Sequence, residues 1–106
     1  MRTASVLLSD NQHADAVSKF VNNDFNGAGM VRIQHIFNPL GKRGGFLRGK
    51  ELKDSYRAFL EQFNLEDWEM QKCIDFLAYR YYSEWVCYLY MVDNQFEGII
   101  AFADWQ

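Results

Sequence analysis

Four cations in a glycine-rich segment are the residues of this sequence best suited to contact phosphate. They flank Phe46 within residues 42–50 and are Lys42, Arg43, Arg48 and Lys50. Cations bind the phosphate backbone and an aromatic ring stacks on bases, so the segment suits contact with a nucleic acid. The competing interpretation is a solvated basic loop that pairs with the protein's own acidic helix. We favour this second interpretation, because the chain has a net charge of −3 and acidic chains are poor general nucleic-acid binders.

The same segment matches a phosphate-binding P-loop as far as its lysine. Residues 44–51 read GGFLRGKE, and a P-loop requires Ser or Thr immediately after the lysine to hold Mg²⁺. Glu51 stands there instead and would bring negative charge towards the phosphates. A chain of 106 residues also has little room for the sheet of a nucleotide hydrolase. We therefore expect no tight nucleotide binding at Lys50.

The other residue types that do chemistry are scattered. Cys73 and Cys87 stand in apolar runs and have neither metal-ligand nor disulfide-framework spacing, so we interpret both as reduced core thiols. His35 falls on the apolar face of an expected strand, and His13 in the first turn of an expected helix. No serine has the glycine elbow of a nucleophile. We predict no catalytic residue, no metal ion and no cofactor.

The residues most suited to binding another protein lie between positions 66 and 85. Aromatic residues make up 17% of the chain, and Trp, Tyr and Arg dominate the hot spots of protein interfaces. We expect an exposed acidic and aromatic patch made of Glu66, Asp67, Glu69, Asp75, Tyr79, Tyr82 and Trp85. A purely structural interpretation stays open. Acids suit the first turn of a helix, and the tyrosines would then only cover the edge of the core.

Several short elements must position these residues. Residues 4–8 form an apolar run typical of a buried strand, and residues 12–22 repeat apolar side chains with helical spacing. Residues 30–37 alternate between apolar and polar, which predicts a half-buried strand. The only proline then opens an exposed glycine-rich and basic loop over residues 38–50.

The second half of the chain predicts two helices and a hairpin. Apolar positions recur with helical spacing over residues 52–63 and 70–81, with a break at Asn64. Residues 85–92 and 96–105 read as two strands joined by a turn. The first of these strands is apolar on both faces, so it should lie centrally in the sheet or meet another surface.

The expected fold is a single α+β domain over residues 1–106. Its mainly antiparallel sheet has about four strands in the sequence order β-α-β-loop-α-α-β-β, with helices packed on it. At this length, and with 49% hydrophobic residues, the chain should bury roughly two-thirds of its unfolded surface. We expect one continuous core that includes Val17, Phe20, Ile33, Phe59, Phe63, Ile74, Leu77, Leu89 and Ile100.

Charge is distributed unevenly along the chain. Residues 42–57 hold six basic and two acidic side chains, whereas residues 58–106 hold two basic and nine acidic ones. This segregation favours a partner with a basic surface. No apolar run approaches the roughly 18 residues of a membrane span, and no secretion signal opens the sequence. We therefore expect a cytoplasmic protein that does not enter a membrane.

These features together predict a non-catalytic module, an inhibitor or adaptor that docks on a larger protein, one that itself accepts nucleic acid. In size and composition the chain is similar to the small anti-defence inhibitors of phages and mobile elements, anti-CRISPR proteins included. The alternative is nucleic-acid or phosphate binding through residues 42–50. A degenerate acetyltransferase-like enzyme comes third, because a glycine-rich loop before a helix resembles the pyrophosphate-binding turn of that family, although the glycine spacing differs. The sequence sets no oligomeric state, and self-association stays open.

Overall fold

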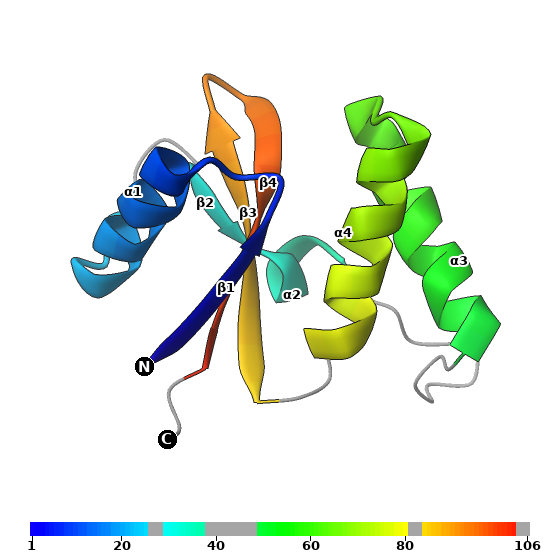
Figure 1. Ribbon diagram of the computed structural model, residues 1–106, viewed down its shortest axis with the longest axis horizontal. Coiled ribbons are helices and arrows are strands. Elements are labelled where there is room, and N and C mark those ends of the chain that lie inside the picture. Colours follow the sequence, from blue (N-terminus) through cyan, green and yellow to red (C-terminus); the bar gives the residue numbers. More distant parts are fainter. Residues whose placement is uncertain (26–28, 38–48, 81–83, 104–106) are drawn as a thin grey trace.

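Four strands form one antiparallel sheet with helices on both faces (Figure 1). The computed structural model describes residues 1–25, 29–37, 49–80 and 84–103, apart from the side chains of His35 and Ile36. The strands are β1 (Arg2–Val6), β2 (Met30–Arg32), β3 (Trp85–Val92) and β4 (Gln95–Ala103), in the spatial order β1-β4-β3-β2. The helices are α1 (Asp10–Val21), α2 (Ile33–Ile36), α3 (Gly49–Leu60) and α4 (Asp67–Arg80), and a 3-10 turn, η2 (Glu61–Phe63), follows α3. The predicted α+β class and four-stranded antiparallel sheet are confirmed.

Local side-chain chemistry explains where the helices begin and end. Ser9 and Gln12 form a capping box at the start of α1: the Ser9 hydroxyl accepts from the Gln12 amide N–H, and the Gln12 side chain accepts from the Ser9 N–H. At the start of α4 the Glu69 carboxylate accepts from the Glu66 N–H at 2.9 Å. Asn64 has a left-handed backbone (φ 55°) and ends η2, as the predicted break requires.

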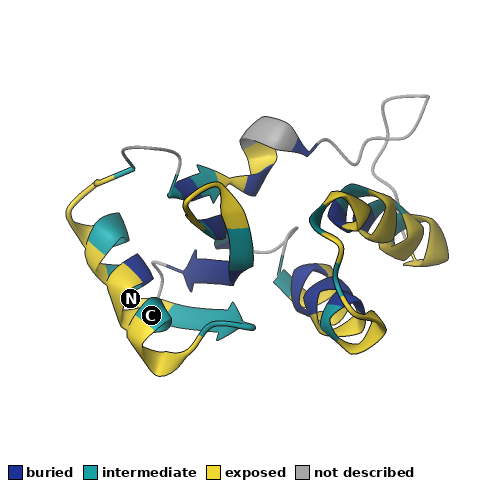
Figure 2. Ribbon diagram, turned by 90° about the horizontal axis from the view of Figure 1, so that it is seen from above, coloured by how far each residue is buried: buried dark blue, intermediate teal, exposed yellow. Residues whose placement is uncertain are grey.

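The sheet divides the hydrophobic core into two clusters. On one face, Tyr88, Tyr90, Ile100 and Phe102 pack against Ala16 of α1, and the opposite faces of β3 and β4 pack against α4. Figure 2 shows this layering, with buried residues on the sheet and on the inner side of α4. The expectation of one continuous core is therefore wrong. Ile100, with the partly buried Val17 and Phe20, belongs to the α1 side, and the other six predicted residues belong to the α4 side.

The central position of β3 is confirmed, because this strand lies between β4 and β2. The predicted strand over residues 30–37, in contrast, is only three residues long, and the chain turns at Ile33 into the helical turn α2. Ile33 and Phe37 are four positions apart, a spacing that places two residues on one face of a strand or of a helix. Both are buried, and Phe37 packs on Tyr56 and Phe59 of α3. His35 therefore has a helical backbone, and its side chain lies outside the described part.

Both cysteines are free and buried, as interpreted from the sequence. Burial raises the pKa of the Cys73 thiol and of the Cys87 thiol to about 12. Burial also raises the pKa of Tyr90 to about 12, assisted by its hydrogen bond to the Asp15 carboxylate. In the described residues, no helix is both long and apolar enough to cross a membrane.

We predict that Leu77→Ala destabilises the fold by about 2–5 kcal/mol, because Leu77 is fully buried on the inner face of α4. Urea melts at neutral pH measure this loss. The exposed neighbour Gln71→Ala is the control, with a change within about 0.5 kcal/mol. A loss below about 1 kcal/mol for Leu77→Ala would show that the cavity collapses or that α4 does not pack there.

We also predict that stability falls at alkaline pH. The folded-state pKa values of Cys73, Cys87 and Tyr90 lie above their ordinary values of 9.0 and 10.0, so their contribution is fully present below about pH 9 and is lost as the pH rises towards 12. Urea midpoints across this range test the prediction. In the double variant Cys73→Ala/Cys87→Ala the decline should begin about one pH unit higher, at the tyrosine. An identical alkaline profile for wild type and double variant would contradict it.

Candidate functional site

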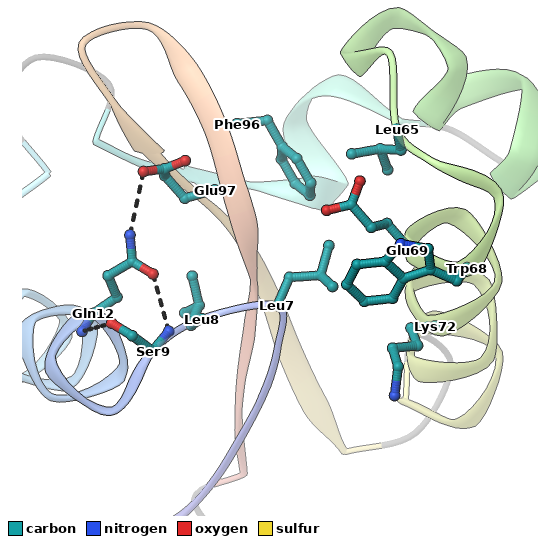
Figure 3. Close-up of a pocket in the computed structure, with 10 residues that line it drawn as sticks. All are labelled: Leu7, Leu8, Ser9, Gln12, Leu65, Trp68, Glu69, Lys72, Phe96 and Glu97. Carbon is teal, nitrogen blue, oxygen red and sulfur yellow. Dashed lines mark hydrogen bonds between the residues drawn. The ribbon is translucent and has the colours of Figure 1, made fainter.

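A groove with a volume of about 650 Å³ crosses the end of the sheet between α1 and α4 (Figure 3). Its lining comes from the link between β1 and α1, the start of α1, the start of β4 and the first half of α4. The lining residues are Leu7, Leu8, Ser9, Gln12, Leu65, Trp68, Glu69, Lys72, Phe96 and Glu97. A concave site of this size falls within the range of ligand clefts.

Three backbone irregularities meet at this groove. Leu7 has a left-handed backbone (φ 69°), which is uncommon for a bulky residue. The pairing of β3 with β4 shifts between Tyr90 and Met91, and Glu97 is the extra residue of this bulge. Next to it, a Cβ on Gly98 would lie 2.4 Å from the backbone oxygen of Val6. Such irregularities persist only where the surroundings hold them, and they are enriched at functional sites.

The apolar part of the groove lies above the α4-side core. Leu7, Leu65 and Phe96 are partly buried and pack against this cluster, and the Phe96 ring stacks on Phe63 at a centroid distance of 4.5 Å. Trp68 stands at the α4 side of the groove with 59% of its surface exposed. Figure 3 shows its indole ring turned towards Leu7. The groove therefore joins a fixed hydrophobic floor to an exposed aromatic wall.

The charged residues of the groove are two carboxylates and one amine. Glu69 uses Oε1 to accept from the Glu66 N–H, and Glu97 uses Oε1 to accept from the Gln12 side-chain amide at 3.2 Å. Both carboxylates are half-buried. Lys72 is exposed, and in Figure 3 its amine points away from both carboxylates. The groove thus has a net negative charge.

The structure places the predicted acidic and aromatic residues in three environments. Glu66, Asp67, Asp75 and Tyr79 are exposed, Tyr79 at 71%, while Glu69 is half-buried in the groove. Tyr82 lies outside the described residues. Trp85 is 7% exposed and belongs to the core, so its inclusion in an exposed patch is wrong.

The cause of the Trp85 error is the position of the residue at the start of a central strand. The guanidinium groups of Arg2 and Arg80 each lie 5.2 Å from the centroid of its ring. The sequence gave no sign of the contact with Arg2, because Arg2 comes from the opposite end of the chain. Among the described residues of this half of the chain, Trp68 is the tryptophan with an exposed side chain.

Most of the predicted phosphate-contacting residues lie outside the described part of the chain, namely Lys42, Arg43 and Arg48. Lys50 is exposed in the first turn of α3, and its amine forms an ion pair with Asp54 at 2.6 Å. Ion pairs between residues four apart are common on helix surfaces, and this pair gives Lys50 a structural role.

A serine and a histidine also come together, which the sequence did not indicate. The Ser5 hydroxyl lies 2.7 Å from Nδ1 of His13, and the Thr3 hydroxyl lies 3.2 Å from Nε2. In the Ser-His-Asp arrangement an acid orients the second nitrogen of the histidine, whereas here that nitrogen meets another hydroxyl of the same strand. The cluster therefore ties α1 to the edge strand β1 and lacks the arrangement of a nucleophile.

Comparisons with known proteins give no relative to compare the groove with, so its interpretation depends on its geometry. No protein-family model matches the chain, and the comparisons with curated proteins and with solved structures found no match either.

We predict that Gly98→Ala destabilises the fold by about 1–3 kcal/mol, because its Cβ would collide with the backbone of Val6 and with Leu8. Thermal and urea melts measure the loss. Gly49→Ala is the comparison variant: its backbone is left-handed (φ 59°), unlike that of Gly98, and a Cβ there meets nothing within 4 Å. This variant should lose only the conformational strain of about 1 kcal/mol. A Gly98→Ala variant as stable as wild type would contradict the close approach of β1 to β4.

Proposed function

We propose that this protein is a non-catalytic binding module that docks on a larger protein with a basic surface. The observation that carries this proposal is the exposure of two large aromatic side chains of α4, Trp68 and Tyr79. The Arg80 guanidinium lies 4.9 Å from the centroid of the Tyr79 ring. Trp68 and Tyr79 are eleven residues apart, which is about three helical turns. Both side chains therefore lie on the same side of the helix, about 16 Å apart along its axis. Asp75 lies between them on that side and is also exposed.

Exposed aromatic side chains on a rigid helix suit protein binding. Trp and Tyr bury a large area while losing few side-chain rotations, which is why they dominate interface hot spots. The fold has no need to expose these two, because α4 already fills its inner face with Met70, Cys73, Ile74, Phe76 and Leu77. Two exposed aromatic side chains on one side of a helix are of the types that protein interfaces favour.

The charges of α4 favour a basic partner. The exposed acids Asp67 and Asp75 of the helix, with Glu66 just before it, outnumber the exposed Lys72. Exposed charges of one sign raise the association rate with a surface of the opposite sign, and salt weakens this effect. A basic surface of this kind also suits a protein that itself accepts nucleic acid, and blocking it would make the module an inhibitor or adaptor.

We predict that the double variant Asp67→Lys/Asp75→Lys slows association with the partner about fivefold or more at low salt and flattens its salt dependence. The partner is captured from an extract of the cells that make the protein, with nuclease added, and the rates are then measured with the isolated partner. Both positions are exposed and leave the cap of Glu69 on α4 in place.

Two further variants complete this test. Glu51→Lys/Glu61→Lys makes the same charge change on exposed positions of α3 and η2, and it should alter the rate by less than about twofold. Tyr79→Ala should chiefly speed dissociation. Capture that nuclease abolishes, together with binding insensitive to all α4 changes, would overturn the proposal and favour the alternative of nucleic-acid contact through residues 42–50.

A further inference from the structure

We infer that the groove at the end of the sheet binds a short extended segment of the partner that carries a lysine or arginine beside an apolar side chain. This inference rests on the proposed function and names the part of the partner that is held. The volume of about 650 Å³ is too small for a folded element and suits a few residues of extended chain.

The floor of the groove accepts the apolar side chain. Leu7, Leu65 and Phe96 present apolar surface there, and each is packed from behind by the α4-side core. A partner side chain that covers this surface removes apolar area from water on both molecules, at about 25 cal/mol per Å² before the costs of association. The floor keeps its shape because Phe96 is stacked on Phe63 and the neighbouring Gly98 is locked against Val6.

The walls of the groove select a positive charge. The Trp68 indole is an exposed aromatic face, which attracts an ammonium or guanidinium group, and Glu69 adds a carboxylate beside it. Glu97 supplies a second carboxylate at the α1 side. In the described part of the chain each carboxylate accepts a hydrogen bond through Oε1, and Oε2 accepts none. An anionic ligand is disfavoured by the same two groups.

The positive charge of Lys72 weakens the preference of the groove for a cationic ligand. Changing Lys72 therefore tests which charge the groove prefers. Among the described residues Lys72 is the one basic side chain of the groove lining, and it is exposed on the turn of α4 that follows Trp68. Removing its charge makes the groove more negative without touching the floor. A cationic ligand should then bind more tightly, and an anionic ligand more weakly.

The experiment titrates the ¹⁵N-labelled full chain with a capped pentapeptide that has arginine at both ends, leucine in the middle and alanine between. The readout is the indole N–H signal of Trp68, identified by its loss in Trp68→Phe. We expect a saturable shift, and about fivefold weaker binding when citrulline replaces both arginines, since citrulline keeps the shape without the charge.

Four variants separate the contributions. Trp68→Ala, followed through other shifted signals, should weaken binding about tenfold, and Glu97→Gln, which keeps the acceptor for Gln12, about threefold. Lys72→Gln should tighten binding about twofold. Asp54→Asn changes an exposed acid on α3, outside the groove, and should leave the affinity within about 1.5-fold.

Equal affinity for the arginine and citrulline peptides, no saturable shift with either, or tighter binding of an acidic peptide with glutamate in place of arginine would overturn the groove assignment. The two proposals fail in different ways. If partner capture still depends on Asp67 and Asp75 while the peptide does not bind, the groove assignment falls and the docking function stands. If capture ignores every α4 change, the docking function falls.

Discussion

The whole structure depends on the burial of both faces of β3 and β4. Alternate residues of these strands pack in opposite directions, so that Tyr88 and Tyr90 meet α1 while Cys87 and Leu89 meet α4. A sheet buried on both faces requires a helix on each side, and this requirement sets the layers seen in Figure 1. It also holds the start of α1 and the first half of α4 on opposite sides of one end of the sheet. The groove is the space left between them.

Elements with strong local patterns could be predicted from the sequence, and elements decided by tertiary contacts could not. The pattern of β3, which is apolar on both faces, predicted its central position in the sheet. Asn64 predicted the end of the helical segment that precedes α4. Residues 30–37 misled because Ile33 and Phe37 satisfy the spacing of a strand and of a helical turn equally well, and packing on α3 decided between them. The contact of the Trp85 ring with Arg2 could not be predicted, because the two residues are far apart in the sequence.

The groove could not be predicted from the sequence, for a related reason. Its lining joins residues 7–12, 65–72 and 96–97, which no local pattern connects. Of the predicted site residues that the structure describes, only Glu69 reaches it, and in the sequence Glu97 is merely one of the nine acids of residues 58–106. The left-handed backbone of Leu7 had no local signal either, since the glycine that permits the crossing, Gly98, lies on another strand.

Both groove carboxylates also serve the start of a helix, and this limits what their charge does for binding. Glu69 caps α4, and Glu97 is bound by Gln12 in the first turn of α1. The positive end of each helix dipole offsets part of the negative charge, so the field in the groove is weaker than two formal charges suggest. The carboxylates therefore contribute mainly to the rate and selectivity of association, as charges at interfaces do. Most of the affinity must therefore come from the exposed Trp68 ring and from the apolar surface that the partly buried floor leaves open.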